Sequence, residues 1–226
     1  MSKVLYIHGM GGGGDSRIPS ILREGFSHPA PSACHPEQSE GSSPSVEVIV
    51  RTYDFDPEKA SDQIASWVEE IKPDLVIGES LGALQALRIR GVPHLFVSPA
   101  LNTSYYFEVL AWLTLIPGVT WIFDRIYKPR DGDRQKLHFT YRVLRKYRNH
   151  RKLALKNTPR LGSKEVFHAF FGTRDHYRKS GIVRIKTWEK HFGSTYTIYD
   201  GTHFMEEEFV RTILVDKVLD VLNSNK

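Results

Sequence analysis

Residues 76–83, with the sequence Val-Ile-Gly-Glu-Ser-Leu-Gly-Ala, decide which fold and which chemistry this chain can support. An apolar run, 75–77, leads into Gly-Glu-Ser-Leu-Gly, and a helical pattern follows from position 83. This arrangement matches the G-x-S-x-G nucleophile elbow, which requires a strand before it and a helix after it. The turn would hold Ser80 at a strained backbone angle, so Gly78 and Gly82 must leave room around it. The pentapeptide alone also fits a plain strand-to-helix turn, so the nucleophile interpretation depends on partner residues.

Two amide groups are placed to stabilise a negative oxygen near Ser80. The N–H of Leu81 would point toward that oxygen from the positive end of the new helix. The first predicted strand, 3–7, ends at His8-Gly9-Met10 and four further glycines, 11–14. Because no lysine follows these glycines, neither common phosphate-loop motif is satisfied. We expect a His-Gly turn that supplies a second N–H from Met10; an ordinary flexible loop is the alternative.

Strands and helices alternate over most of the chain, which predicts a mainly parallel sheet with helices on both faces, an α/β fold. Active sites in such sheets lie beyond the carboxyl ends of the strands. We therefore expect His8, Gly9 and Glu79 to line a site around Ser80, with His8 structural or lining rather than the catalytic base. The expected strands are 3–7, 46–51, 74–77, 93–97, 165–171 and 195–199. A first helix, capped by residue 15 or 16, is expected to run to about 25, and the other expected helices run from 57 to 72, from 83 to 89, from 176 to 188 and from 206 to 222.

Two further residues complete a catalytic arrangement with Ser80. Asp175 follows the strand at 165–171, and His203 follows the last strand. Serine needs a general base because its protonated hydroxyl is a poor nucleophile. His203 would take the proton of Ser80, and Asp175 would hold the imidazole in the required tautomer. Asp54 is the reserve acid and His176 a weaker candidate base.

The alternation stops between residues 101 and 162, where we expect an inserted helical cap. Residues 109–123 carry no charge but include Trp112 and Trp121. The stretch is too short to span a membrane and is interrupted by Pro-Gly, so we predict two short helices over the site, with both tryptophans near the substrate. A peripheral core hairpin and contact with a membrane interface are the alternatives. A helix is expected around 135–155.

Four landmarks of this sequence resemble the α/β-hydrolase superfamily: Tyr-Ile-His-Gly, Gly-Glu-Ser-Leu-Gly, Gly-Thr-Arg-Asp and Gly-Thr-His-Phe. The first strand leads directly to His-Gly, as in the compact YqiA-like bacterial esterases. The resemblance covers residues 1–100 and 163–226 and implies a serine hydrolase acting on esters or thioesters. It assigns Ser80, Asp175 and His203 to the triad and the amides of Met10 and Leu81 to the oxyanion hole. The insertions at 27–45 and 101–162 lie outside this motif set.

Composition is consistent with one core domain, since 226 residues with 40% hydrophobic side chains can bury a substantial core. The single cysteine, Cys34, excludes an intramolecular disulfide and fits a cytoplasmic location. Cys34 with His28 and His35 lacks regular ligand spacing, so we expect no metal, and the mechanism needs no cofactor. Residues 27–45, rich in Pro and Ser, are expected to form an exposed mobile loop.

Positive charge is concentrated in one segment. Residues 125–160 hold 13 of the 31 Lys and Arg residues but only 2 of the 26 acidic ones. Such a run most often forms a solvated helix face; an anionic substrate such as an acyl-CoA thioester is another interpretation. An inactive hydrolase-fold binding module that uses this segment for an anionic partner is the alternative function. Nucleic acid is not expected as a partner, because no binding motif is present; peripheral contact with an anionic membrane stays open, and the sequence carries no signal for an oligomeric state.

Overall fold

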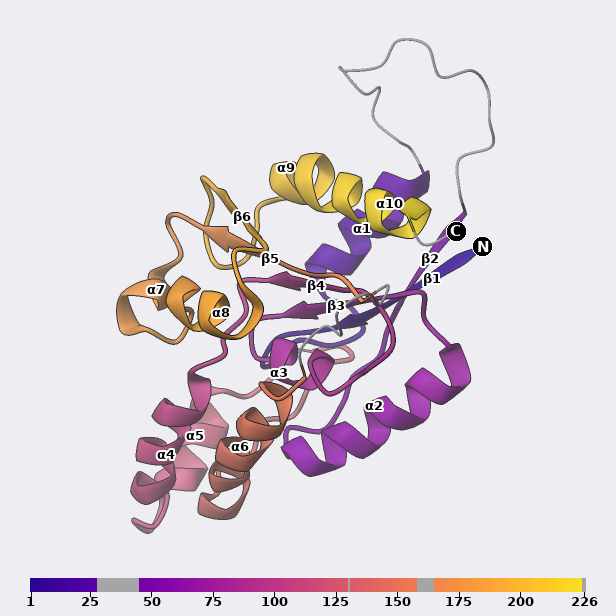
Figure 1. Cartoon of the computed structure of the whole chain (residues 1–226). Coiled ribbons are helices and arrows are strands. Elements are labelled where there is room, and N and C mark those ends of the chain that lie inside the picture. Colours follow the sequence, from indigo (N-terminus) through magenta and orange to yellow (C-terminus); the bar gives the residue numbers. More distant parts are fainter. Residues whose placement is uncertain (28–44, 130, 158–164, 225–226) are drawn as a thin grey trace, which may run out of the picture.

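The computed structural model describes residues 1–27, 45–129, 131–157 and 165–224 (Figure 1). Its centre is a six-stranded parallel sheet with the order β2-β1-β3-β4-β5-β6. Each predicted strand is present within two residues of its expected ends, and the predicted α/β fold class is confirmed. The strands are β1 (Ser2–Ile7), β2 (Val46–Val50), β3 (Leu75–Glu79), β4 (His94–Val97), β5 (Phe167–Gly172) and β6 (Tyr196–Tyr199).

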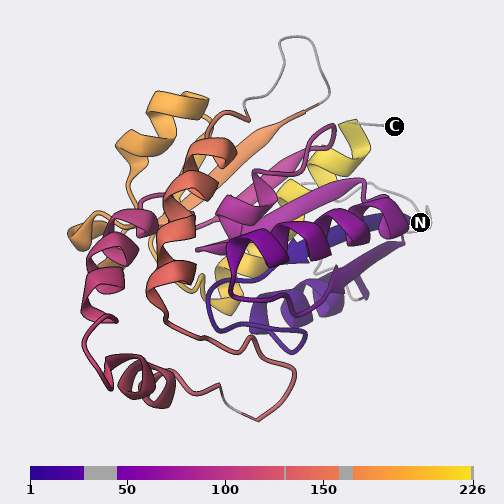
Figure 2. The same ribbon diagram turned by 90° about the horizontal axis from the view of Figure 1, so that it is seen from below.

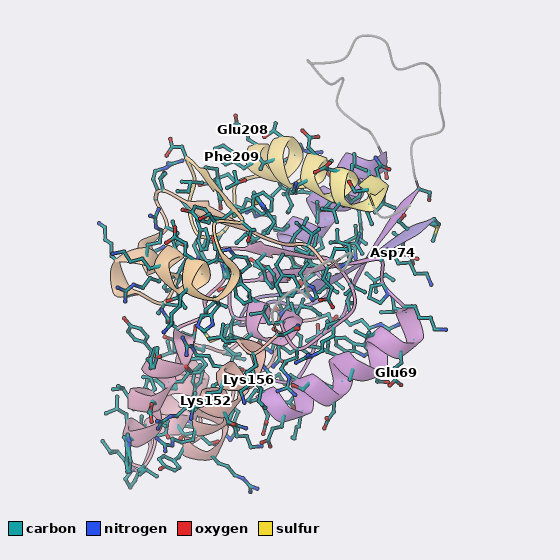
Figure 3. The ribbon with its side chains drawn as sticks, in the orientation of Figure 1. Glu69, Asp74, Lys152, Lys156, Glu208 and Phe209 are labelled. Atoms are coloured by element: carbon teal, nitrogen blue, oxygen red, sulfur yellow. The ribbon has the colours of Figure 1, made fainter. Side chains whose placement is uncertain are left out.

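Helices cover both faces of the sheet (Figures 1 and 2). One face carries α1 (Arg17–Ser27) and the C-terminal segment α9 (Glu207–Phe209), η1 (Val210–Leu214) and α10 (Val215–Ser224). The other carries α2 (Pro57–Ile71), α3 (Gly82–Ala86) and α8 (Ile185–Phe192). Figure 3 labels Glu208 on α9 and Glu69 on α2, which lie on opposite sides of the sheet. The strands are buried between these layers, so their carboxyl ends form the exposed edge where a site can be built.

Local sequence explains where helix α2 begins. Asp56 caps it by accepting a hydrogen bond from the amide of Glu58 at 3.0 Å, and Pro57 occupies the first turn. Proline suits this position because its missing N–H would have no partner there anyway. The predicted opening of this helix at Asp56-Pro57 is therefore confirmed.

Three helices are inserted between β4 and β5: α4 (Thr103–Leu113), α5 (Val119–Ile126) and α6 (Tyr141–Ala154). Figure 1 shows them together at the lower left, at one edge of the molecule. Cations of α6 hold this unit together and attach it to the core. Arg145 and Arg148 both pair with Glu108 of α4, and Lys146 pairs with Asp56 at the cap of α2. Much of the basic segment thus makes contacts within the chain, which its charge pattern did not indicate.

The helix expected around 135–155 begins only at Tyr141. Thr140 caps it through a hydrogen bond from the amide of Val143 to its hydroxyl. The preceding stretch has no regular secondary structure; Gln135, Leu137 and Phe139 are buried and the residues between them are exposed. This alternation has the period of a strand rather than of a helix, so the expectation was wrong for residues 135–140.

Two other helices differ from expectation. The segment 176–188 is divided into α7 (His176–Ser180) and α8, because Gly181 takes a left-handed conformation that ends the first helix. The C-terminal helix contains the π-helical turn η1. The predicted loop at 27–45 lies outside the described residues except for its two ends, and so do His28, Cys34 and His35.

Candidate active site

The elbow after β3 has the geometry that its glycines predict. Ser80 has a φ of 49°, a left-handed conformation that is uncommon for a residue with a side chain. A Cβ atom at Gly82 would lie 2.3 Å from the carbonyl oxygen of His8, and one at Gly78 would lie 2.8 Å from the Cβ of Ala86. Both positions therefore require glycine, so that the turn can pack against β1 and α3 while it lifts Ser80 above the sheet edge.

Three side chains form a continuous hydrogen-bonded chain at this edge. The Oγ of Ser80 lies 2.8 Å from Nε2 of His203, and Nδ1 of His203 lies 2.8 Å from Oδ2 of Asp175. Asp175 and His203 are both buried. Because an ionised carboxylate can only accept a hydrogen bond, it keeps the proton on Nδ1 and leaves Nε2 free to accept the proton of Ser80. The arrangement can therefore activate a hydroxyl group for attack.

Neighbouring residues hold Asp175 and His203 in place. Oδ1 of Asp175 accepts a second hydrogen bond from the amide of Tyr177 at 2.8 Å, at the start of α7. The rings of Tyr177 and His203 lie 4.6 Å apart, edge to face, and burial raises the pKa of Tyr177, so its hydroxyl stays neutral. The loop that carries His203 is held by a hydrogen bond from the hydroxyl of Tyr199 to the carbonyl of Thr202.

The competing acid and base candidates make other contacts. Asp54 accepts a hydrogen bond from the amide of Asp56 at the start of α2. Asp200 is exposed and pairs with Arg174. The ring of His176 lies 6.1 Å from that of His203 and does not take its place in the chain.

The two residues expected to supply the oxyanion hole line one cavity together with Ser80. Ser80, Leu81 and Met10 all line one cavity of about 310 Å³. Within the described part of the chain, the amides of Leu81 and Met10 donate no hydrogen bond, although Leu81 is buried. A buried N–H without a partner is costly, and substrate oxygen is a partner that would satisfy it.

Gln135 fixes the loop that carries Met10, and sequence reasoning missed it. The side-chain Oε1 of Gln135 accepts a hydrogen bond from the backbone N–H of Gly11 at 3.1 Å, and the backbone N–H of Gln135 donates to the carbonyl of Gly12 at 2.7 Å. Its Nε2 donates to the carbonyl of Tyr53 at 3.2 Å. The segment before α6 therefore holds the glycine loop in place. The strand-like alternation at 135–139 is the sequence signal that could have revealed this segment.

Two cavities meet at Ser80 and differ in character. The larger is mostly apolar and is lined from the inserted helices by Tyr106, Phe107, Leu110 and Tyr127, and from the core by residues that include Tyr177 and Phe204. The smaller, about 220 Å³, is lined by the glycine loop with Arg17, Glu79 and Arg134. The predicted lining residues Gly9 and Glu79 belong to this polar cavity, where Glu79 accepts a hydrogen bond from Tyr6 at 2.8 Å.

His8 lies beneath the site rather than in it. It is fully buried, stacks on Tyr53 with 4.3 Å between ring centroids, and donates from Nδ1 to the carbonyl of Gly9 at 2.7 Å. Burial lowers its pKa to about 4, so the ring is neutral near pH 7. Of the two roles expected for His8, the structural one fits these contacts and the lining one does not.

Trp112 and Trp121 point away from the nucleophile. Their side chains are 58% and 65% exposed, and among the described residues neither belongs to the set that lines the two cavities at Ser80. Trp112 contacts Tyr141, and Trp121 lies beneath Arg125. Neither tryptophan therefore lines the cavities at Ser80 as expected; α4, which carries Trp112, contributes Tyr106, Phe107 and Leu110 instead, and α5, which carries Trp121, contributes no residue.

The described residues contain neither a metal-binding cluster nor a membrane-spanning helix. In residues 1–27, 45–129, 131–157 and 165–224, His, Cys, Asp and Glu form no cluster of three or more that could hold a metal ion. Over the same residues, no helix has both the length and the apolar character needed to cross a bilayer.

Comparison with known proteins assigns the fold. No family model and no curated sequence matches this chain. Solved structures do match it over nearly its full length. The monoacylglycerol lipase of Paleococcus ferrophilus is 16% identical, covers 99% of this chain and 95% of its own, and has a TM-score of 0.56. Est1E from Butyrivibrio proteoclasticus, solved with ferulic acid, is 15% identical, with coverages of 99% and 90% and a TM-score of 0.60.

A third similar structure is described as a synthase and not as an esterase or a lipase. Tomato methylketone synthase I, in complex with beta-ketoheptanoate, is 9% identical and covers 100% of this chain and 99% of its own, with a TM-score of 0.58. At these identities the likeness defines the fold and not the reaction. The chain has the α/β-hydrolase fold, which confirms the fold expected from its motifs.

Proposed function

We propose that this protein is a serine hydrolase that cleaves a carboxylic ester or thioester through an acyl-enzyme. The observation that carries the proposal is the unbroken hydrogen-bonded chain from Ser80 through His203 to Asp175, which ends beside two amides without partners. Esterases and lipases among the structural neighbours support the reaction class.

In the first half-reaction, Oγ of Ser80 attacks the carbonyl carbon while Nε2 of His203 takes the hydroxyl proton. The carbonyl oxygen becomes an oxyanion, which accepts hydrogen bonds from the amides of Met10 and Leu81. The tetrahedral intermediate then collapses, the bond to the leaving group breaks, and His203 gives its proton to the departing alcohol or thiol. Asp175 stabilises the imidazolium that forms between these steps.

Water completes the cycle. It gives a proton to His203 and attacks the acyl carbon, and collapse of the second tetrahedral intermediate returns the proton to Ser80 and releases a carboxylic acid. The enzyme regains its starting state without any redox change.

The two cavities suggest how a substrate lies in the site. The apolar cavity would accept the acyl chain, because Leu110, Phe107 and Tyr127 surround it. The polar cavity, with Arg17, Glu79 and the glycine loop, would accept the leaving group. We propose that residues 101–162 act as the cap of a core formed by 1–100 and 163–226, since α4 supplies part of the acyl cavity.

The alternative, an inactive binding module that uses residues 125–160, has less support. Arg145, Lys146 and Arg151 in this segment make ion pairs or hydrogen bonds within the chain, and the triad geometry is complete. An acyl-CoA thioester is a substrate of the proposed class, and thioesters with and without the phosphorylated moiety would measure any contribution of the remaining cations.

The test is hydrolysis of p-nitrophenyl esters of graded acyl length by the wild type and by Ser80→Ala. We expect kcat to fall on the order of 10⁴-fold or more in the variant. Ser98→Ala is the matched control, because Ser98 is also a buried serine at a strand end with a positive φ, 45°, and should keep near wild-type activity. Equal hydrolysis by the wild type and Ser80→Ala would refute the proposal.

A further inference from the structure

Exposed apolar side chains are concentrated on one part of the molecule. In the described residues, 17 large apolar side chains are exposed, and 11 of them lie between residues 105 and 127. We call α4, α5 and the turn between them, residues 103–126, together with Tyr127, the apolar hairpin. Scattered exposed apolar residues are ordinary on protein surfaces, but a concentration of this kind marks a binding surface. The members are Tyr105, Tyr106, Val109, Trp112, Leu113, Leu115, Ile116, Trp121, Ile122, Ile126 and Tyr127.

One side of the hairpin is not covered by the rest of the described chain, although Phe107 and Ala111 on its inner side are buried. Helix α5 has no buried residue, although five of its eight side chains are apolar. Figures 1 and 2 place α4 and α5 at the outer edge of the molecule, away from the sheet. The side of the hairpin that carries Val109, Trp112 and Ile122 is therefore open to contact from outside the chain.

Charge around the hairpin is arranged asymmetrically. Residues 109–123 carry no charge, and the acidic residues that flank them are already paired. Glu108 pairs with Arg145 and Arg148, and Asp124 accepts hydrogen bonds from the ring of His138 and from the amide of Phe139. Nearby cations are exposed instead, namely Arg125, Lys128 and Arg142. Arg125 lies 5.6 Å from the centroid of the Trp121 ring, at the boundary between the apolar and basic parts.

This combination matches one class of partner. An apolar surface with tryptophans and a rim of cations is typical of segments that lie in the interface of a bilayer. Helices of 11 and 8 residues are too short to span it. A second copy of this chain would bring the same cations together, whereas anionic lipid headgroups would neutralise them.

We propose that the apolar hairpin docks this protein on the surface of an anionic phospholipid bilayer, with α5 and the Trp112 side of α4 in the interface. The cations of the rim contact the headgroups. Two apolar faces of α4 then have separate roles, because Tyr106 and Leu110 line the cavity at Ser80 while Val109 and Trp112 face outward. Docking would place the mouth of that cavity next to lipid; this last point rests on the proposed function, but docking itself does not.

The test is sedimentation of the full-length Ser80→Ala variant with vesicles, so that binding is measured without turnover. One set of vesicles is phosphatidylcholine alone, and the other contains phosphatidylglycerol in addition. We expect binding to the anionic vesicles that weakens as salt is raised. Arg125→Gln should weaken it about fivefold, since each cation near the surface contributes roughly 1 kcal/mol.

A matched pair of variants separates the hairpin from general surface effects. Ile122 on α5 is 47% exposed and Ile198 on β6 is 49% exposed. Ile122→Glu should weaken vesicle binding at least roughly tenfold, because an isoleucine side chain that becomes buried in the bilayer contributes more than about 1.4 kcal/mol. Ile198→Glu should leave vesicle binding unchanged. Thermal unfolding of both variants checks that each remains folded, independently of any hydrolase activity.

Four results would overturn the proposal. Absence of binding to anionic vesicles would exclude docking, and equal loss in Ile122→Glu and Ile198→Glu would exclude the hairpin as its site. Equal binding to the neutral vesicles would exclude the basic rim. If the wild type were a dimer that Ile122→Glu converts to a monomer, without vesicle binding, the hairpin would be an interface between two copies.

Discussion

Replacing Asp175 with asparagine tests whether the third member of the triad acts through the tautomer of His203. Both carboxylate oxygens of Asp175 accept hydrogen bonds, Oδ2 from Nδ1 of His203 and Oδ1 from the amide of Tyr177, each at 2.8 Å. An asparagine has one oxygen and one NH₂ group, so it cannot accept both. If its oxygen faces Tyr177, its NH₂ group faces Nδ1 and favours the tautomer with the proton on Nε2.

In that tautomer Nε2 of His203 carries a proton and faces the hydroxyl of Ser80, so His203 can no longer take the serine proton. If the oxygen faces His203 instead, the NH₂ group faces the amide N–H of Tyr177, and two donors meet without an acceptor. Either orientation disfavours the productive state. We expect kcat to fall on the order of 10⁴-fold, which corresponds to about 5.5 kcal/mol in activation free energy.

The assay is steady-state hydrolysis of a p-nitrophenyl ester that the wild type cleaves, with Asp200→Asn as the matched control. Asp200 lies on the same loop as His203 but is exposed and pairs with Arg174, so its amide should change kcat by less than about threefold. A fall of less than tenfold in Asp175→Asn, or an equal fall in both variants, would refute the assigned role of Asp175.

Two further predictions follow from buried histidines and from the shape of the apolar cavity. Burial lowers the pKa of His8 and of His150 to about 4, so the unfolded state, with pKa near 6.5, binds protons first as pH falls. The stability that these neutral histidines contribute is present above pH 6.5 and is lost toward pH 4, so the free energy of unfolding should fall by roughly 2 kcal/mol per histidine between pH 7 and pH 5. Equal unfolding free energies in urea at the two pH values would contradict this. Leu110→Trp should lower kcat/KM for long acyl esters at least roughly tenfold and leave kcat/KM for acetyl esters unchanged. Leu113→Trp, on the exposed side of α4, should leave kcat/KM unchanged for both kinds of ester. An equal loss for both chain lengths would show that Leu110 does not bound the acyl chain.

The sheet and the positions of the triad residues could be predicted because their signals are local. Gly78, Ser80 and Gly82 act within one turn, and the close contacts at both glycines explain why that spacing is required. Asp175 and His203 could be placed together because each follows a parallel strand, and the carboxyl ends of such strands meet at one edge.

The inserted helices could not be oriented from sequence in the same way. Helix α4 is apolar on more than one side, so periodicity did not reveal that Leu110 faces the cavity and Trp112 faces outward. The ion pair between Lys146 and Asp56 joins residues far apart in the chain, so a charge count over 125–160 did not predict it. Gln135 was missed because the stretch that holds it was assigned to a helix.

Labelling with a fluorophosphonate probe, followed by intact and peptide mass analysis, tests the proposed function most directly. The probe reacts with a serine only when a base activates it and an oxyanion site accepts its oxygen. We expect the wild type to gain one adduct at Ser80, and Ser80→Ala and His203→Gln to gain none. A wild type that hydrolyses esters without an adduct at Ser80, or equal labelling of Ser80→Ala, would contradict the assignment of Ser80 as the nucleophile.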